Sequence, residues 1–259
     1  MPRSTAVAIR CWRRSRTPPR PLLASPRGLL TDRNSSVAIS ADLTLDELRI
    51  ALAPAIADAA VFDGWTPLAV ANAAESEGVD AEVAKFAFKA DGSSSAMVLI
   101  GAWIAAIDRA MAEALPLETL APLKIRERIR RLVQFRLDAV AGQQEALRRA
   151  LAIMAMPQNA ARALRLGWKS ADAMWRLAGD TATDYNHYTK RMTLGALYAS
   201  TLTVFAQDES EGFADTKAFL DRRIDNVMQF EKVKAQVLRP DAERFSPARL
   251  LGRLRYPAR

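Results

Sequence analysis

The apolar residues from Leu43 onward recur at i, i+3, i+4 and i+7, and no stretch alternates apolar and polar residues with period two. Glycines and prolines fall mostly between these periodic segments. The pattern predicts an all-α fold of about nine to ten helices. The expected helices span residues 43–60, 67–77, 81–88, 93–114, 119–141, 143–154, 158–178, 184–206, 213–237 and 246–255.

Several of these helices have recognisable starts. Asp42 precedes the first periodic segment, and both Thr66-Pro67 and the segment PQNA at Pro157 place a proline at a first helical position. The longest apolar run, AMVLIGAWIAAI at residues 96–107, is shorter than the roughly 18 residues that span a bilayer. This run predicts a buried helix rather than a membrane span.

The net charge of +8 is unevenly distributed along the chain. Residues 1–40 hold eight arginines and one aspartate, residues 41–92 have a net charge of −7, and residues 93–259 carry +8. We expect a disordered basic tail at 1–40. Its Arg-rich, acid-poor composition is typical of a mitochondrial transit peptide, and an extended or misassigned start explains it equally well. No apolar core follows the arginines, so a secretory signal is not expected.

Residues 41–92 predict a helix, a turn at Asp63-Gly64, a short helix, a turn at Gly78 and another short helix. This order looks like the helix-turn-helix start of TetR-type regulators, which a helical ligand domain follows. The last helix, however, begins with acidic residues, and a module of charge −7 would repel DNA phosphates. We therefore expect a vestigial module at 41–92 and no nucleic-acid partner. The alternative function is a TetR-type transcriptional regulator that responds to a hydrophobic effector.

The sequence lacks the usual signatures of catalysis. It contains no Gly-x-Gly, no phosphate-binding loop and no Gly-x-Ser-x-Gly elbow. Cys11 and His187 are the single cysteine and histidine, so a zinc site built from several such residues is excluded. Asp184-x-x-His187 has the spacing of a di-iron ligand pair, but the second pair would need a second histidine. We expect no catalytic residue, no metal and no cofactor.

The segment GDTATDYNHYTKR at residues 179–191 is the densest polar cluster. Gly179 fits a helix C-cap, and Asp180 and two threonines offer capping oxygens to the next helix, where Thr181-x-x-Asp184 resembles a capping box. Aromatic and charged residues this dense near a helix start are typical of a protein-binding surface. A core tyrosine with surface charges is the alternative.

Two segments, MWRLAGDTATDYNHYTKR at 174–191 and FLDRRIDNVMQFEK at 219–232, resemble the ubiquinone-biosynthesis accessory proteins called the coenzyme Q protein nine family. The resemblance covers roughly residues 41–238. It implies a TetR-like, homodimeric lipid-binding protein that is not an enzyme. The family presents ubiquinone precursors to the demethoxyubiquinone hydroxylase, a di-iron membrane enzyme, which is the implied partner.

The family's docking surface carries over by matching positions. His187 departs from the animal proteins, which have tryptophan there, and the smaller imidazole offers less apolar area. Tyr188 keeps the family pattern and is the stronger candidate. The implied docking residues are Asp172, Met174, Trp175, Asp180, Asp184, Asn186, His187 and Tyr188.

A lipid site requires an apolar cavity between helices. The expected helices at 93–114 and 184–206 are apolar around most of their circumference, and small residues such as Gly101 and Gly195 leave room between them. An ordinary filled core is the alternative. The predicted lining residues are Met97, Leu99, Ile100, Trp103, Leu194, Leu197, Tyr198 and Thr201.

The C-terminal segment at 239–259, which follows the helical body at 93–238, ends in RFSPARLLGRLRYPAR. Its short amphipathic, basic helix suits an anionic membrane surface, and a surface-packed end helix is the alternative. We expect a peripheral protein on the cytoplasmic face of a bacterial inner membrane, or alternatively on the matrix side of the mitochondrial inner membrane. The predicted membrane residues are Phe245, Arg249, Leu250, Leu251, Arg253 and Leu254.

Overall fold

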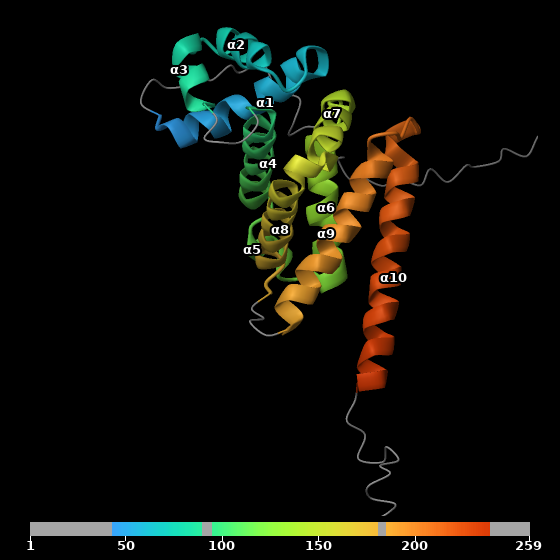
Figure 1. The fold of residues 1–259 in the computed structure, drawn as a ribbon. Helices are drawn as coiled ribbons and strands as arrows, with labels where there is room; N and C mark the ends of the chain where they lie inside the picture. The colour runs from blue at the N-terminus through green and yellow to red at the C-terminus, as the bar shows by residue number, and fades with distance from the viewer. Residues whose placement is uncertain (1–42, 90–94, 181–184, 239–259) are drawn as a thin grey trace, which may run out of the picture. The chain divides into compact units, whose positions relative to one another are not determined.

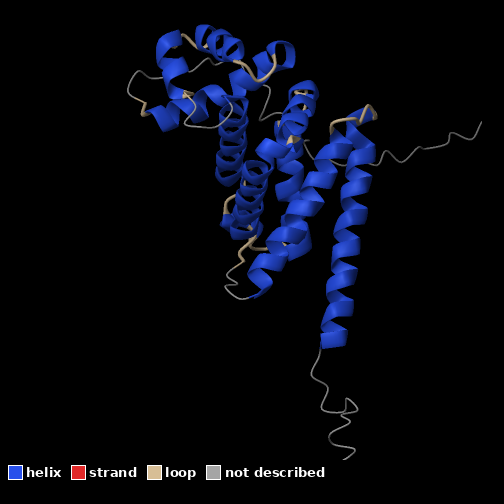
Figure 2. Ribbon diagram, viewed as in Figure 1, coloured by secondary structure: helices blue, strands red, loops and turns tan. Residues whose placement is uncertain are grey.

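The computed structural model describes residues 43–89, 95–180 and 185–238, with side chains for all of these except 185–186 and 230–238. All of them belong to one structural unit, residues 38–259. Within the described ranges every regular element is a helix (Figure 2), which confirms the predicted all-α class. The elements, labelled in Figure 1, are α1 (Leu45–Asp63), α2 (Pro67–Ser76), α3 (Ala81–Ala87), α4 (Ser95–Ala114), α5 (Leu117–Leu120), α6 (Ile125–Ala139), α7 (Gln144–Ala155), η2 (Pro157–Asn159), α8 (Ala160–Leu177), α9 (Tyr185–Phe205), η3 (Glu211–Phe213) and α10 (Ala214–Leu238).

The prediction of one helix at 119–141 is wrong. The structure has the short helix α5 and then α6, with a break between them at Pro122. Proline lacks the backbone N–H that a helix interior needs, and its ring clashes with the preceding turn of a helix. The expected helix at 246–255 lies outside the described residues.

The helix starts are set by side-chain caps. α1 begins two residues later than Asp42 suggests, because Thr44 and Glu47 form a reciprocal capping box. The N–H of Thr44 donates to Glu47 Oε2 at 2.9 Å, and the N–H of Glu47 donates back to Thr44 Oγ1. Thr66 caps α2 ahead of Pro67, as predicted. Asp80 accepts from two backbone N–H groups at the start of α3, so this acid stabilises a helix end rather than facing a ligand.

Helices α1, α2 and α3 pack on one another (Figure 1), and α1 also packs on α4 and α7. Gly64 and Gly78 form the turns between the three helices, both with φ of 69°, a conformation that glycine adopts easily. Trp65 joins this module to the rest: its indole N–H donates to the Ala146 carbonyl at 3.0 Å, and its ring lies 5.1 Å from that of Trp103. The module therefore shares its core with the helices that follow.

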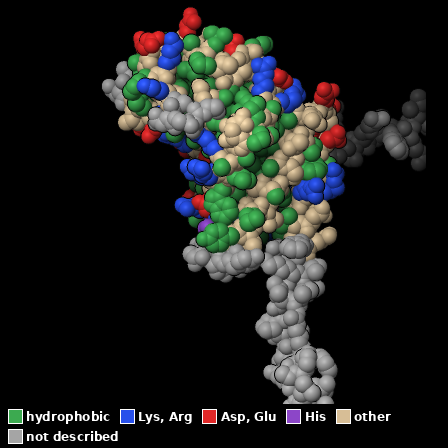
Figure 3. Space-filling view, in the orientation of Figure 1, with side chains coloured by type: hydrophobic (Ala, Val, Ile, Leu, Met, Phe, Trp, Pro, Cys, Tyr) green, Lys and Arg blue, Asp and Glu red, His purple; other side chains and the backbone are tan. Residues whose placement is uncertain are grey.

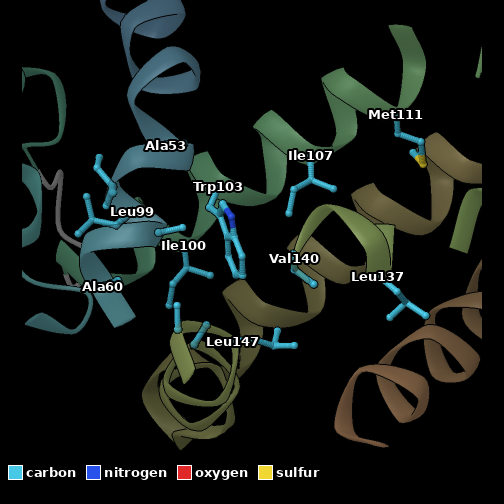
Figure 4. Close-up of a cluster of buried hydrophobic side chains, with 14 of the residues drawn as sticks. Ala53, Ala60, Leu99, Ile100, Trp103, Ile107, Met111, Leu137, Val140 and Leu147 are labelled. Carbon is cyan, nitrogen blue, oxygen red and sulfur yellow. The ribbon is translucent and has the colours of Figure 1, made fainter. Parts of the chain in front are cut away.

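Helix α4 is the centre of that core. Figure 4 shows Ile100, Trp103 and Ile107 along α4, among Val140 and Leu147 from neighbouring helices, and each of these side chains is buried. By length and composition alone α4 could cross a membrane. It instead packs on α1, α6, α7 and α8, which agrees with the prediction of a buried helix.

The last two long helices, α9 and α10, run side by side (Figure 1), and α10 also contacts α6. Arg130 of α6 donates to Asp221 of α10 at 2.7 Å, and Arg126 pairs with Asp225. Phe205 and Phe213 pack at 4.7 Å across the turn between α9 and α10. The two helices thereby cover the side of the bundle on which both cavities described below lie.

Candidate functional site

An apolar cavity of about 540 Å³ lies among α4, α6, α7, α8 and α9, and we call it the α8–α9 cavity. Its wall is almost entirely hydrocarbon, and it includes Gly167 and Gly195, whose missing side chains leave space. The lining residues are Ile100, Trp103, Ile104, Ile107, Arg136, Val140, Leu147, Ala150, Leu151, Met154, Ala155, Ala163, Leu164, Gly167, Trp168, Ser170, Arg191, Met192, Gly195, Ala196, Tyr198, Ala199 and Leu202.

The cavity opens to the surface between α8 and α9. Leu164 and Met192 line it, yet they are 75% and 66% exposed, so they form its rim. Ala196 and Ala199 continue this exposed edge along α9. Large apolar side chains at the mouth of an apolar cavity are typical of a site that receives a hydrophobic ligand.

A small part of the wall of the α8–α9 cavity is polar. Arg136 of α6 lines it with a side chain that is only 1% exposed. Its guanidinium pairs with Asp108 of α4, donates from Nη2 to Ser170 Oγ at 3.1 Å, and stacks 4.8 Å above the ring of Tyr198. Its Nε–H has no acceptor among the described residues. A buried charged group of this kind normally satisfies all its donors.

Arg136 stays positively charged in this setting. Burial on its own would lower the pKa of the guanidinium, but the nearby Tyr198 and Asp108 outweigh burial and raise it. Arg136 is therefore a fixed cation of the cavity wall.

A second cavity of about 440 Å³, which we call the α6–α10 cavity, lies among α6, α8, α9 and α10. Apolar residues such as Ile129 and Met228 line it together with Arg126, Arg128 and Lys190. Those three cations have partners: Arg126 pairs with Asp225, Arg128 donates to three backbone carbonyls, and Lys190 pairs with Asp180. This wall is more polar than that of the α8–α9 cavity.

The structure distributes the predicted lipid-lining residues over several places. Ile100, Trp103 and Tyr198 line the α8–α9 cavity, whereas Leu194 and Leu197 line the α6–α10 cavity. Met97, Leu99 and Thr201 line neither and are buried in the core. The prediction placed α4 and α9 in the wall. It omitted α7 and α8, whose strongly one-sided apolar faces supply much of the lining.

The loop after α8 is fixed by its glycine. Gly179 has φ of 85°, and the N–H groups of Gly179 and Asp180 donate to the carbonyls of Arg176 and Trp175. This is a Schellman cap, which confirms the predicted C-cap. Arg128 of α6 donates to the Ala178 carbonyl at 2.7 Å and holds the loop against α6.

Beyond this cap, four side chains form what we call the Arg191 cluster: Asp172, Asp180, Lys190 and Arg191. Arg191 is 3% exposed and donates from Nε to Asp172 Oδ1 at 2.6 Å and from Nη1 to Asp180 Oδ2 at 3.1 Å. Lys190 donates to the other oxygen of Asp180 at 2.6 Å. The Asp180 carboxylate therefore joins the end of α8 to the first turns of α9. The capping groups predicted between Thr181 and Asp184 lie outside the described residues.

Trp175 belongs to the same junction. Its indole N–H donates to the Lys190 carbonyl at 3.0 Å, and the Lys190 ammonium lies 5.4 Å from its ring. Trp175 is half-buried against the core. Its ring therefore supports the α8–α9 contact from the side of the α6–α10 cavity.

Three rings form an aromatic patch on the surface of α8 and α9: Trp168, His187 and Tyr188. The Trp168 ring lies 5.9 Å from that of Tyr188 and 6.3 Å from that of His187, and the last two meet edge to face at 5.2 Å. Tyr188 is 58% exposed. Figure 3 shows hydrophobic side chains gathered over this face beside the histidine. Trp168 also lines the α8–α9 cavity, so patch and cavity share a wall.

The predicted docking residues fall into three groups. Tyr188 and His187 reach the surface, whereas Met174 is completely buried and supports α8 from inside. Asp172, Trp175 and Asp180 join α8 to α9 as described above. Asp184 and the side chain of Asn186 lie outside the described part. Sequence reasoning missed Trp168, Leu164 and Met192, whose exposure depends on how α8 and α9 pack.

Within the described ranges no three His, Cys, Asp or Glu side chains gather in a way that could hold a metal ion. The carboxylates of the Arg191 cluster face cations instead. The site as a whole offers apolar volume, two buried arginines and exposed aromatic rings, which is an arrangement for binding.

Comparisons with known proteins agree with this geometry. Residues 160–231, which include the Arg191 cluster and the aromatic patch, match the model of the COQ9 family. The "Ubiquinone biosynthesis protein COQ9, mitochondrial" of Rattus norvegicus is 35% identical over 177 residues, 67% of this chain and 56% of that protein. The protein of the same name from Homo sapiens is 34% identical over 177 residues, 67% of this chain and 55% of that protein. This chain thus spans about half the length of these relatives.

The fold also has a solved counterpart. A TetR transcriptional regulator from Nitrosomonas europaea ATCC 19718 superposes with a TM-score of 0.56 at 21% identity, over 71% of this chain and 99% of that chain. Its likeness confirms the TetR-like arrangement of helices and carries no further functional information. By its matched residues and its fold, this chain belongs to the COQ9 family.

Proposed function

We propose that this protein is a lipid-binding accessory protein of ubiquinone biosynthesis, without catalytic activity of its own. It binds an isoprenoid quinone precursor at a membrane and presents it to the demethoxyubiquinone hydroxylase. The α8–α9 cavity carries this proposal, because it is large, apolar and open at one side. The names of the relatives support the pathway.

The size of the cavity suits part of an isoprenoid lipid. Ligand sites in proteins commonly have volumes of roughly 300–1,000 Å³, and this cavity has about 540 Å³. A long isoprenoid chain would extend beyond it, past Leu164 and Met192 at the rim. Those exposed apolar side chains would then lie against the lipid or the bilayer.

The aromatic patch supplies the docking surface in this proposal. Exposed aromatic side chains next to charged ones dominate many protein–protein contacts. Because Trp168 belongs to both the patch and the cavity wall, a hydroxylase bound at Tyr188 would stand beside the cavity. The ligand would then have a short path from one protein to the other.

The membrane and oligomeric parts of the proposal rest on the sequence. The basic C-terminal segment with Phe245, Arg249, Leu250, Leu251, Arg253 and Leu254 lies outside the described residues, and we propose it as the contact with an anionic membrane. The relatives are named as mitochondrial proteins, which supports a mitochondrial location, the alternative to the bacterial inner membrane that we expected. The matrix side of the inner membrane is our proposal for that alternative. We propose a homodimer, as the family resemblance implies.

Lipid extraction tests the binding function. Protein purified without detergent from a ubiquinone-producing host should release isoprenoid lipid in an amount comparable to the protein, as measured by mass spectrometry, and should sediment with anionic liposomes. Protein that carries no isoprenoid lipid and does not bind such liposomes would refute the proposal.

The helix-turn-helix-like order of α1, α2 and α3 makes a transcriptional regulator the second candidate. The electrostatics of the module oppose it: residues 41–92 carry a net charge of −7, and α3 exposes Val83 and Phe86 where a DNA reader needs polar and basic side chains. A mobility-shift assay at low salt, with the upstream DNA of the protein's own locus, separates the two. Our proposal predicts no shift, and a sequence-specific shift would favour the regulator.

A further inference from the structure

We propose that the α6–α10 cavity is a second ligand site, which binds a single-chain amphiphile with a carboxylate head at Arg128. This inference goes beyond the proposed function, which concerns an isoprenoid quinone precursor in the α8–α9 cavity, and it does not depend on that function. The two cavities lie on opposite faces of α9: Leu194 and Leu197 line the α6–α10 cavity, whereas Gly195 and Tyr198 line the α8–α9 cavity.

The wall of the α6–α10 cavity combines hydrocarbon with cations. Much of it is apolar and comes from three helices, with Ile129 of α6, Leu194 of α9 and Met228 of α10 among the lining residues. Arg128 and Lys190 join this wall at the loop that follows α8. The volume of about 440 Å³ lies in the lower part of the roughly 300–1,000 Å³ that ligand sites commonly have, which suits one apolar chain.

The charge balance of this wall decides what kind of head group fits. Arg126 pairs with Asp225, and Lys190 pairs with Asp180. Arg128 makes no ion pair with any carboxylate of the described residues and donates to three backbone carbonyls instead. A cation without a counter-ion beside a low-dielectric cavity attracts anions. Because Arg128 is the one cation of the described wall without such a partner, a head of a single negative charge fits best, and a carboxylate has that charge.

The Arg128 guanidinium is fixed in place and reachable. It donates to the carbonyls of Leu123, Ala178 and Ala121 at 2.9, 2.7 and 2.6 Å, respectively. These bonds use three of the five N–H groups of a guanidinium and leave two for a ligand. Ala178 and Gly179 line the cavity, so Nη1 lies at its wall, and the Arg128 side chain is half-buried. A donor that is already ordered gains a charge-assisted hydrogen bond at little cost in freedom.

The start of α6 adds positive potential to the same wall. Its N-cap is Lys124, which makes no side-chain hydrogen bond to the helix, and Ile125 and Arg126 of the first turn line the cavity. The N-terminus of a helix carries a partial positive charge, so cations there repel it. Glu127, the acid of this turn, pairs with arginines one turn later. A carboxylate bound at Arg128 therefore offsets an accumulation of positive charge.

Three matched probes test the inference by isothermal titration calorimetry of the full chain. Decanoate carries the anionic head, decanol has a chain of the same length without charge, and acetate has the head without the chain. The wild type should bind decanoate about tenfold more tightly than decanol, because hydrogen bonds between charged groups contribute roughly that much. It should give no measurable heat with acetate, which lacks the apolar chain. Equal affinities for decanoate and decanol, or no binding of decanoate, overturn the inference.

Two filling variants locate the bound decanoate. Of the two cavities, Thr193 lines only the α6–α10 cavity and Gly167 lines only the α8–α9 cavity. Thr193→Phe should weaken decanoate binding at least about tenfold, whereas Gly167→Phe should keep it within about twofold of the wild type. Decanoate binding that survives Thr193→Phe, or that is lost in Gly167→Phe, overturns the inference. The isoprenoid lipid of the proposed function should show the opposite dependence on these variants, so the two claims can fail separately.

A charge variant tests the role of Arg128. Arg128→Gln should bring the affinity for decanoate down to about that for decanol and leave the affinity for decanol within about twofold of the wild type. Arg131→Gln is the matched control, because Arg131 is an exposed arginine of the same helix that lines neither cavity. A preference for decanoate that survives Arg128→Gln, or that disappears in Arg131→Gln, contradicts the site.

A second variant covers the case in which Arg128→Gln fails to fold. Lys190→Gln removes a partly exposed cation from the same wall. It should lower the preference for decanoate over decanol about threefold, because the attraction between partly exposed charges is modest. An unchanged preference in Lys190→Gln then refutes the carboxylate site.

Discussion

Arg191 and Asp180 form an ion pair in which both side chains are almost fully buried, with 3.1 Å between Nη1 and Oδ2. The same guanidinium holds Asp172 through Nε, so one arginine ties the carboxylates of α8 and its C-terminal loop to α9. Arg191 therefore joins the two helices that frame the mouth of the cavity and the aromatic patch, together with Lys190 and Trp175.

We predict that Arg191→Ala destabilises the protein by about 3–5 kcal/mol, because it leaves two aspartates in a poorly solvated place without their main partner. Urea unfolding followed by circular dichroism measures this. Arg176→Ala is the matched control, since Arg176 binds the same Asp172 with a side chain that is 74% exposed, and it should cost less than about 1 kcal/mol. Similar losses for both variants would argue against a structural role of Arg191.

Gly179→Ala should destabilise the end of α8 by about 1–2 kcal/mol. The positive φ strains any residue with a Cβ, and that Cβ would stand 3.0 Å from Arg128 Nη1 and 3.4 Å from Leu117. In contrast, Gly167→Ala within α8 should stabilise by about 0.5–1 kcal/mol, because a Cβ there meets no atom within 4 Å. Chemical denaturation of both variants should give opposite signs.

Asp208 makes the stability of the turn between α9 and α10 depend on pH. Burial on its own would raise its pKa, but hydrogen bonds from the hydroxyl and backbone N–H groups of Ser210 and Thr216 outweigh burial and lower the pKa from 3.8 to about 2. Because the folded pKa is the lower one, the ionised carboxylate stabilises the fold fully above about pH 4–5, and this contribution is lost as pH falls toward 2.

Asp208→Asn should therefore lower the free energy of unfolding by about 1–2 kcal/mol at neutral pH, and by much less at pH 2. Thermal melts of both proteins between pH 2 and pH 7 test this, with Glu209→Gln as the neighbouring control. A difference from the wild type that stays constant with pH would show that Asp208 is not the titrating group.

Tyr188→Ala should abolish co-purification with the hydroxylase and leave the fold intact, because Tyr188 is 58% exposed. Phe62→Ala is the control, since Phe62 is an aromatic side chain that is 83% exposed on α1, far from the patch in sequence and on a different element. It should keep the interaction. If both variants lose the hydroxylase, or if neither does, the aromatic patch is not the docking surface.

The features that the sequence predicted correctly are those formed by residues close together in the chain. The spacing of apolar residues located most helices, and Gly179 and Thr66 marked caps whose chemistry acts within a few residues. Pro122 was an overlooked local signal, and it divides the expected helix at 119–141. The Thr44–Glu47 capping box is also a local signal, and the prediction used Asp42 in its place.

The parts of the site that the sequence did not reveal depend on contacts between distant segments. Arg136 reads as one more arginine of a basic amphipathic helix, and only the packing of α4, α8 and α9 around it makes it a buried donor. Likewise, Arg191 meets partners 11 and 19 residues earlier on another element. Trp168 is a third such case, because its place between the cavity and Tyr188 depends on how α9 packs on α8.

The central claim, that the α8–α9 cavity holds a lipid, is tested most directly by native mass spectrometry of Gly167→Phe. Gly167 lines the cavity at its exposed edge, and a side chain there meets no nearby atom, so phenylalanine can lie across the opening without strain and with better helix propensity than glycine. Lys169→Phe places the same ring on an exposed position of α8 as the control. We predict bound isoprenoid lipid in the wild type and in Lys169→Phe and none in Gly167→Phe at unchanged melting temperature, whereas equal lipid in all three proteins would contradict the claim.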